Sequence, residues 1–145
     1  MKLEKKKIQH LIRIAADARK FSYAPYSHFA VGAALLGADA KIYTGCNIEN
    51  AAFTPGNCAE RTAIFKAVSE GCREFSAIAI VGGKLDEDAL AQAGYTAPCG
   101  VCRQVLREFV NPSAFAVILA RTIEAYKVYT LEELLPESFG PENLK

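Results

Sequence analysis

The chain has 145 residues, 51% hydrophobic and 23% charged, a composition that suits one globular domain over residues 1–145 with a substantial core. Its formal net charge is only +1, so the sequence gives no electrostatic reason to expect binding to nucleic acid or to an anionic membrane. No apolar run approaches the roughly 20 residues of a membrane span, and charges stand where a signal peptide needs apolar residues, so a soluble cytoplasmic protein is expected.

The first part of the chain predicts a helix and a hairpin. Apolar residues at helical spacing predict an amphipathic helix over residues 3–20. They are Ile8, Leu11, Ile12, Ala15 and Ala18. Residues 29–36 form a compact apolar run, and a second extended stretch covers residues 41–46, so an antiparallel hairpin is expected around the turn at 37–40. The polar residues 47–57, with a Pro-Gly pair, are then predicted to form a loop.

Two predicted helices in the middle of the chain begin at cysteines. Residues 59–70 are good helix formers and Gly71 stands where a helix stop is expected, which puts Cys58 at a helix N-terminus. A continuous apolar run over residues 75–81 predicts a buried strand. Apolar spacing after Cys99 predicts another helix that begins near that residue.

The last part of the chain completes the predicted architecture. Residues 114–120 and 126–129 are typical of strands, and Thr130 followed by Glu133 is a capping-box pattern that starts a short helix. The order is one helix, two strands, and then alternating helices and strands. It predicts a three-layer α/β/α sandwich with a five-stranded mixed sheet.

The spacing of the cysteines indicates a metal site. Five cysteines are an odd number and are not dense, which favours metal-binding or catalytic thiolates in a reducing compartment over a disulfide scaffold. Cys99 and Cys102 form a C-x-x-C pair on a first helical turn, where both sulfurs can face one point. Cys58 is the best third ligand, because a helix N-terminus favours a thiolate. Three thiolates would leave one position of a zinc ion open for water, as in catalytic sites.

Glu60 is the natural proton carrier beside this metal, because it lies two residues from Cys58. Two alternatives stay open. The C-x-x-C pair could be a redox pair or a chance occurrence. A closed site could instead use Cys46 or Cys72 as a fourth ligand, although both are expected to be ordinary buried cysteines.

Several motifs resemble the small homotetrameric cytidine deaminases, zinc enzymes of the cytidine/deoxycytidylate deaminase superfamily. That superfamily pairs a His-x-Glu or Cys-x-Glu motif with Pro-Cys-x-x-Cys. The matching segments are YAPYS (23–27), FAVGAA (29–34), GCNIEN (45–50), CAERT (58–62), PCGVCRQ (98–104) and LLP (134–136). The resemblance implies hydrolytic deamination of cytidine and deoxycytidine to uridine and deoxyuridine plus ammonia, in pyrimidine salvage.

The resemblance also implies the roles at the metal. Cys58, Cys99 and Cys102 would hold one zinc ion per chain, and a zinc-activated hydroxide would attack C4 of the cytosine ring. Glu60 would be a proton shuttle and not a ligand, protonating N3 and then the departing amino group. Arg61 would hydrogen-bond the thiolates and offset the formal charge of −1 that three of them leave on the site.

Substrate contacts are implied in the same way. The backbone N–H of Ala59 would hold the ring carbonyl oxygen, and Asn47 and Glu49 would bind the ribose hydroxyls. Phe29 would pack against the base. Phe139 would reach into the active site of a neighbouring subunit, in a homotetramer whose sites are shared between subunits.

The sequence departs from the family pattern at two places. Phe53 stands where the family often has tyrosine, so a hydrogen bond from that hydroxyl near the sugar is lost. The segment 84–97 is longer than the corresponding loop of compact family members.

Competing functions make different demands on the same residues. A blasticidin S-type nucleoside deaminase would share the cysteine motifs, but the intact motif from Asn47 to Glu49 favours a ribonucleoside. Deaminases of nucleic acids or nucleotides usually carry histidine as first ligand, and neither His10 nor His28 lies in a ligand motif. A non-catalytic zinc-binding module would not need Glu60.

Overall fold

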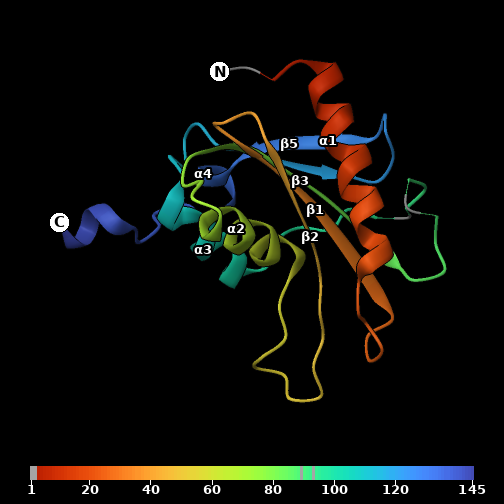
Figure 1. The fold of residues 1–145 in the computed structure, drawn as a ribbon. Coiled ribbons are helices and arrows are strands. Elements are labelled where there is room, and N and C mark those ends of the chain that lie inside the picture. Colours follow the sequence, from red (N-terminus) through yellow and green to blue (C-terminus); the bar gives the residue numbers. More distant parts are fainter. Residues whose placement is uncertain (1–2, 89, 93) are drawn as a thin grey trace.

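A five-stranded mixed sheet forms the middle of the computed structural model, which describes residues 3–88, 90–92 and 94–145 (Figure 1). The strands are β1 (Phe29–Gly37), β2 (Ile42–Cys46), β3 (Phe75–Lys84), β4 (Ala116–Ala120) and β5 (Tyr126–Thr130). Their order in the sheet is β2-β1-β3-β4-β5. β1 pairs antiparallel with β2 and β3, β3 pairs parallel with β4, and β4 pairs antiparallel with β5. The predicted mixed sheet is therefore confirmed.

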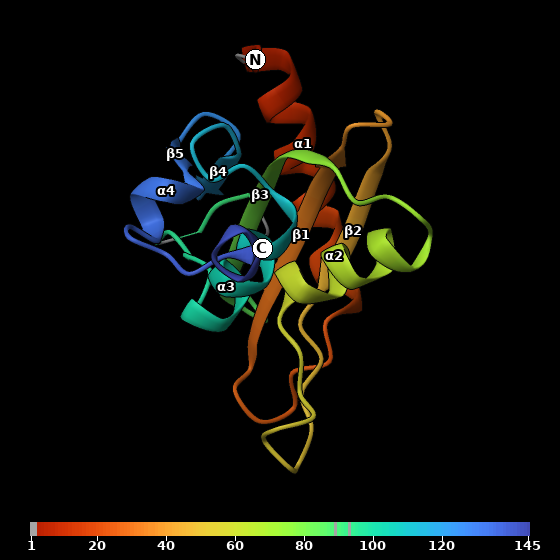
Figure 2. The same ribbon diagram turned by 90° about the vertical axis from the view of Figure 1, so that its left-hand side faces the viewer.

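Helices cover both faces of this sheet (Figures 1 and 2). On one face lies α1 (Lys5–Ala18), which continues into a 3₁₀ turn at Arg19–Phe21; on the other lie α2 (Ala59–Ser69) and α3 (Gly100–Phe109). The short helix α4 (Leu131–Leu134) and a 3₁₀ turn at Pro141–Leu144 follow β5. None of the helices in the described parts of the chain is both long and apolar enough to span a membrane. The predicted three-layer arrangement is confirmed.

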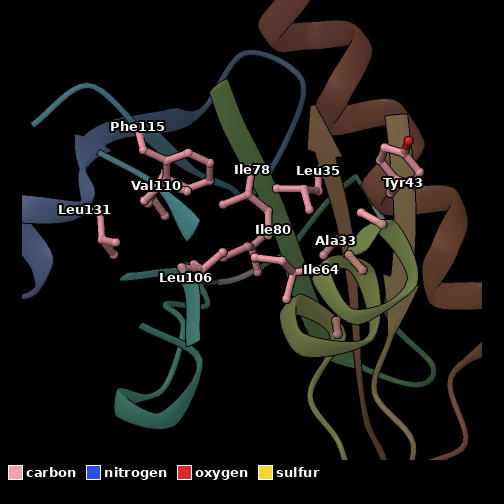
Figure 3. Close-up of a cluster of buried hydrophobic side chains, with 14 of the residues drawn as sticks. Ala33, Leu35, Tyr43, Ile64, Ile78, Ile80, Leu106, Val110, Phe115 and Leu131 are labelled. Atoms are coloured by element: carbon pink, nitrogen blue, oxygen red, sulfur yellow. The ribbon is translucent and has the colours of Figure 1, made fainter. Parts of the chain in front are cut away.

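The strand β3 is buried from both sides, which explains the continuous apolar run from Ala77 to Val81. Ile78 and Ile80 pack under α2 and α3 in the cluster drawn in Figure 3. Ala77 and Ala79, which alternate with them, face α1 on the opposite side of the sheet. Because side chains of a strand alternate between faces, one apolar run serves both cores.

Close packing of α2 on the sheet fixes the start of this helix. A Cβ atom added at Gly45 in β2 would overlap the carbonyl oxygen of Ala59, the first residue of α2. Glycine at this position therefore lets the N-terminus of α2, with Cys58 as its N-cap, lie directly against β2.

Several element boundaries differ from the sequence prediction by one to three residues, among them the start of β4 at Ala116 and not at residue 114, and two of the differences have a clear physical cause. The first helix ends at Ala18 and not near residue 20, and the buried Arg19 after it donates hydrogen bonds to the carbonyls of Ala30, Gly83 and Lys84 at 2.9, 3.0 and 2.9 Å. β3 runs to Lys84 and not to residue 81, because its two glycines still pair with β1. Backbone pairing decides this end, although glycine lowers strand propensity.

Candidate active site

Three cysteine sulfurs meet where the N-termini of α2 and α3 converge. Cys58 is the N-cap of α2, Cys99 is the N-cap of α3, and Cys102 lies in the first turn of α3. The three sulfurs lie within 4.8 Å of one another, and those of Cys58 and Cys99 are 3.9 Å apart. Thiolates are soft donors that suit zinc, and three of them around one point fit a single ion.

The other two cysteines stay apart from this group. In the part of the chain that the structure describes, the only group of three or more candidate ligand residues is Cys58, Cys99 and Cys102. Cys46 and Cys72 are half-buried and not fully buried as expected, and the Cys72 thiol lies 3.5 Å from the carbonyl oxygen of Glu74. The alternative of a closed four-cysteine site therefore finds no support.

The cysteine group favours a negative charge. A hydrogen bond from Cys102, followed by one from Arg61, lowers the pKa of the Cys58 thiol to about 5. Nη2 of Arg61 lies 3.3 Å from Sγ of Cys58, and this contact raises the pKa of the guanidinium. The hydrogen bond to Cys58 and burial raise the pKa of Cys102. One thiolate held by an arginine is thus present at neutral pH, ready for a cation.

The Glu60 carboxyl lies beside these thiols in the first turn of α2 and is only 4% exposed. Burial raises its pKa to about 7, and the charge of Cys58 acts in the same direction. A carboxyl with a pKa near neutrality can both accept and donate a proton, which is the property of a general acid–base group.

A cavity of about 550 Å³ opens next to Cys58 and Arg61. The loop between β2 and α2 forms much of its wall and projects beyond the sheet (Figures 1 and 2). Asn47, Glu49 and the highly exposed Phe53 belong to this wall. The structure therefore brings the predicted sugar-binding pair to the same cavity as Cys58, one of the three predicted metal ligands.

Glu49 is held in place by the backbone of the segment before β1. Its Oε1 accepts hydrogen bonds from the backbone N–H groups of Tyr26 and Ser27, at 2.9 and 3.2 Å. The hydrogen bond with the Ser27 side chain, together with these backbone bonds, lowers the pKa of Glu49, so that it is charged at neutral pH. Both backbone contacts use Oε1, and a carboxylate has further acceptor positions for a ligand.

Asn47 joins this loop to β1. Its Oδ1 accepts from the N–H of Val31 at 2.9 Å, and its Nδ2 donates to the carbonyl of Phe29 at 2.8 Å. One Nδ2 hydrogen remains for a ligand. The same contact holds the backbone of Phe29, the first residue of β1, whose side chain is 38% exposed.

The two remaining predicted residues lie in different places. Ala59 is fully buried and is the first residue of α2, and the side chain of the N-cap residue Cys58 makes no capping hydrogen bond to this N-terminus. Phe139 is 59% exposed and lies outside the cavity of its own chain.

Sequence reasoning missed two residues whose hydrogen bonds hold the backbone carbonyl of Cys58. Nδ2 of Asn57 donates to Oγ1 of Thr62 at 3.2 Å, and that hydroxyl donates to the carbonyl of Cys58 at 3.0 Å. Thr62 belongs to the CAERT segment, so its place one turn after Cys58 was the available signal.

Comparison with known protein families identifies the family to which this group of residues belongs. Residues 5–118 match the family model described as the cytidine and deoxycytidylate deaminase zinc-binding region. The chain belongs to this deaminase family. All three cysteines of the group lie inside the region that the model matches. The predicted family membership and zinc cofactor are thereby confirmed.

Individual relatives of this family member are similar over most of their length. The cytidine deaminase of Sporosarcina psychrophila is 47% identical over 137 residues, which are 94% of each chain. The crystal structure of cytidine deaminase from Burkholderia pseudomallei has a TM-score of 0.79 at 45% identity and covers 90% of this chain and 97% of its own. The crystal structure of cytidine deaminase from Mycobacterium tuberculosis has a TM-score of 0.73 at 34% identity and covers 90% of this chain and 95% of its own.

Proposed function

We propose that the chain is a zinc-dependent cytidine deaminase that hydrolyses cytidine and deoxycytidine to uridine and deoxyuridine plus ammonia. The observation that carries this proposal is the convergence of three cysteine sulfurs beside the buried Glu60, with one of them, Cys58, lining a cavity of about 550 Å³. The relatives named above, which are cytidine deaminases, support the same activity.

Cys58, Cys99 and Cys102 would hold one zinc ion per chain. When bound, the ion supplies a Lewis acid with an open position, which lowers the pKa of water to near neutrality. Arg61 would offset part of the negative charge of the three thiolates, because its guanidinium already contacts Cys58.

Glu60 would carry the two protons that hydrolysis moves. The oxygen of a water molecule bonds to C4 of the base, and Glu60 passes one proton of that water to N3. Glu60 then passes the second proton to the amino group, whose bond to C4 breaks as ammonia leaves and the carbonyl forms. The buried carboxyl, with a pKa near 7, can take up and release each proton at neutral pH.

The nucleoside would be oriented by groups around the cavity. The carboxylate of Glu49 and the second Nδ2 hydrogen of Asn47 would bind the sugar hydroxyls. The backbone N–H of Ala59, at a helix N-terminus, would donate to the carbonyl oxygen of the base. The half-exposed ring of Phe29 would pack against the base.

The direct test of this function is the product. Purified, zinc-replete protein should convert cytidine into equal amounts of uridine and ammonia, with the matching fall in cytosine absorbance. Failure to form uridine under these conditions would refute the proposed activity.

Homotetrameric assembly with shared sites is part of this proposal. Phe21, Phe53 and Phe139 are 80%, 90% and 59% exposed in the single chain. Large exposed aromatic side chains typically become buried in protein interfaces. Phe139 would then contact the nucleoside in a neighbouring subunit.

Replacing Phe139 by Ala should raise KM for cytidine about tenfold with unchanged zinc content, because an aromatic contact with the substrate is lost. Leu144→Ala, which removes an even more exposed apolar side chain from the same C-terminal segment, is the control and should leave KM unchanged. Light scattering with the wild-type protein should show a tetramer. A fully active monomer, or an unchanged KM in the Phe139 variant, would contradict the shared site.

A further inference from the structure

The C-terminal segment that carries Phe139 is bound by the helix that also carries two of the cysteines. Arg107, in the last turn of α3, is only 7% exposed. Its Nε donates to Oγ of Ser138 at 2.8 Å, and its terminal nitrogens pair with the carboxylate of Glu142. Figure 1 shows this segment leaving the body of the molecule beyond α4.

A second α3 side chain binds the backbone next to these contacts. Nε2 of Gln104 donates to the carbonyl of Phe139 at 2.9 Å. The segment is also closed on itself, because the N–H of Gly140 donates to Oδ1 of Asn143 at 2.8 Å. Contacts from α3 therefore reach residues on both sides of Phe139 and its own carbonyl.

Gly140 allows the guanidinium to lie against the backbone. A Cβ atom added at this position would overlap the guanidinium carbon and both terminal nitrogens of Arg107. The backbone of Gly140 is extended, with φ −145°, a conformation open to any residue. Close approach of Arg107, and not backbone geometry, is what requires glycine here.

The burial of Arg107 makes this attachment strong. A buried charge is costly unless it is paired, and the hydrogen-bond partners of this guanidinium, Ser138 and Glu142, both belong to the C-terminal segment. Release of the segment would leave the charge without these partners. The backbone around Phe139 is thus held while its ring stays exposed, and a segment whose backbone is already ordered loses less entropy on contact with a partner.

We propose that Arg107 is a positioning residue for the nucleoside site, which latches residues 138–142 to α3 and so fixes Phe139 for its contact with a neighbouring subunit's substrate. This inference rests on the proposed deaminase function and on the role proposed for Phe139. Arg107 acts through Phe139 and touches no reacting group.

Arg107→Met should raise KM for cytidine about fivefold, with kcat and zinc content unchanged. Gly140→Ala should raise KM by a similar factor without altering a charge, because the added methyl group displaces the Arg107 guanidinium. Arg107→Lys, which keeps the charge, should recover part of the loss. The control is Arg13→Met, which removes an exposed arginine from α1 and should leave KM unchanged.

A double-mutant cycle separates a latch from a general structural role. In the Phe139→Ala background, Arg107→Met should raise KM no further, because the side chain that it positions is gone. An additive increase, or an unchanged KM in both Arg107→Met and Gly140→Ala, would overturn the inference. If Arg107→Met fails to fold, Gly140→Ala decides. Wild-type protein that forms no uridine would refute the deaminase function itself, which is a distinct result.

Discussion

Glu60→Gln is expected to lower kcat for cytidine by about 10²-fold or more, while zinc content and fold are retained. Glutamine has the shape and hydrogen-bonding capacity of the neutral acid but cannot carry a proton between water, N3 and the amino group. The fold should tolerate the change, because burial already disfavours the charged form of this carboxyl and raises its pKa.

The control for this variant is Glu70→Gln, which makes the same change at the exposed C-terminal end of α2. It should leave kcat near the wild-type value. Circular dichroism and elemental zinc analysis of both variants separate a chemical defect from a folding defect. Turnover close to wild type in Glu60→Gln would remove this carboxyl from the proton transfers.

Cytidine 5′-monophosphate should be a poor substrate, with kcat/KM about 10²-fold or more below that of cytidine at the same ionic strength. Glu49 is charged at neutral pH, lines the cavity and is assigned to the sugar, so it would repel a phosphate placed nearby. Among the described residues that line this cavity, Arg61 is the only lysine or arginine, and it is bound to Cys58.

Glu49→Gln offers the matched test of this explanation. Removal of the charge should weaken cytidine binding and reduce the difference in kcat/KM between cytidine and cytidine 5′-monophosphate. Comparable kcat/KM values for both substrates in the wild-type protein would show that another basic group faces the sugar, and the assignment of Glu49 would have to be abandoned.

Local patterns were sufficient to predict most of the fold. The apolar run of β3, the helix stop at Gly71 and the capping box at Thr130 each depend on neighbouring residues only, and the structure has all three features, including both hydrogen bonds of that capping box. The predicted end of β3 was wrong, because pairing with β1 overrides the low strand propensity of Gly82 and Gly83.

Some residues of the candidate site could be predicted from the sequence and others could not. The three cysteines could be grouped from sequence, because Cys99 and Cys102 share a predicted first helical turn and Cys58 stands at another predicted helix start, where a thiolate is favoured. The backbone contacts that orient Glu49 could not, because N–H groups carry no sequence signal. The contact between Arg107 and Glu142 joins residues 35 positions apart, which no local pattern encodes.

Zinc titration of metal-free protein tests the requirement for the metal, since deamination of cytidine at this site needs one zinc ion held by Cys58, Cys99 and Cys102. Chelator-treated protein should form no uridine, and the rate should rise linearly with added zinc up to one equivalent per chain. Full uridine formation by protein that elemental analysis shows to be free of metal would contradict zinc-dependent deamination.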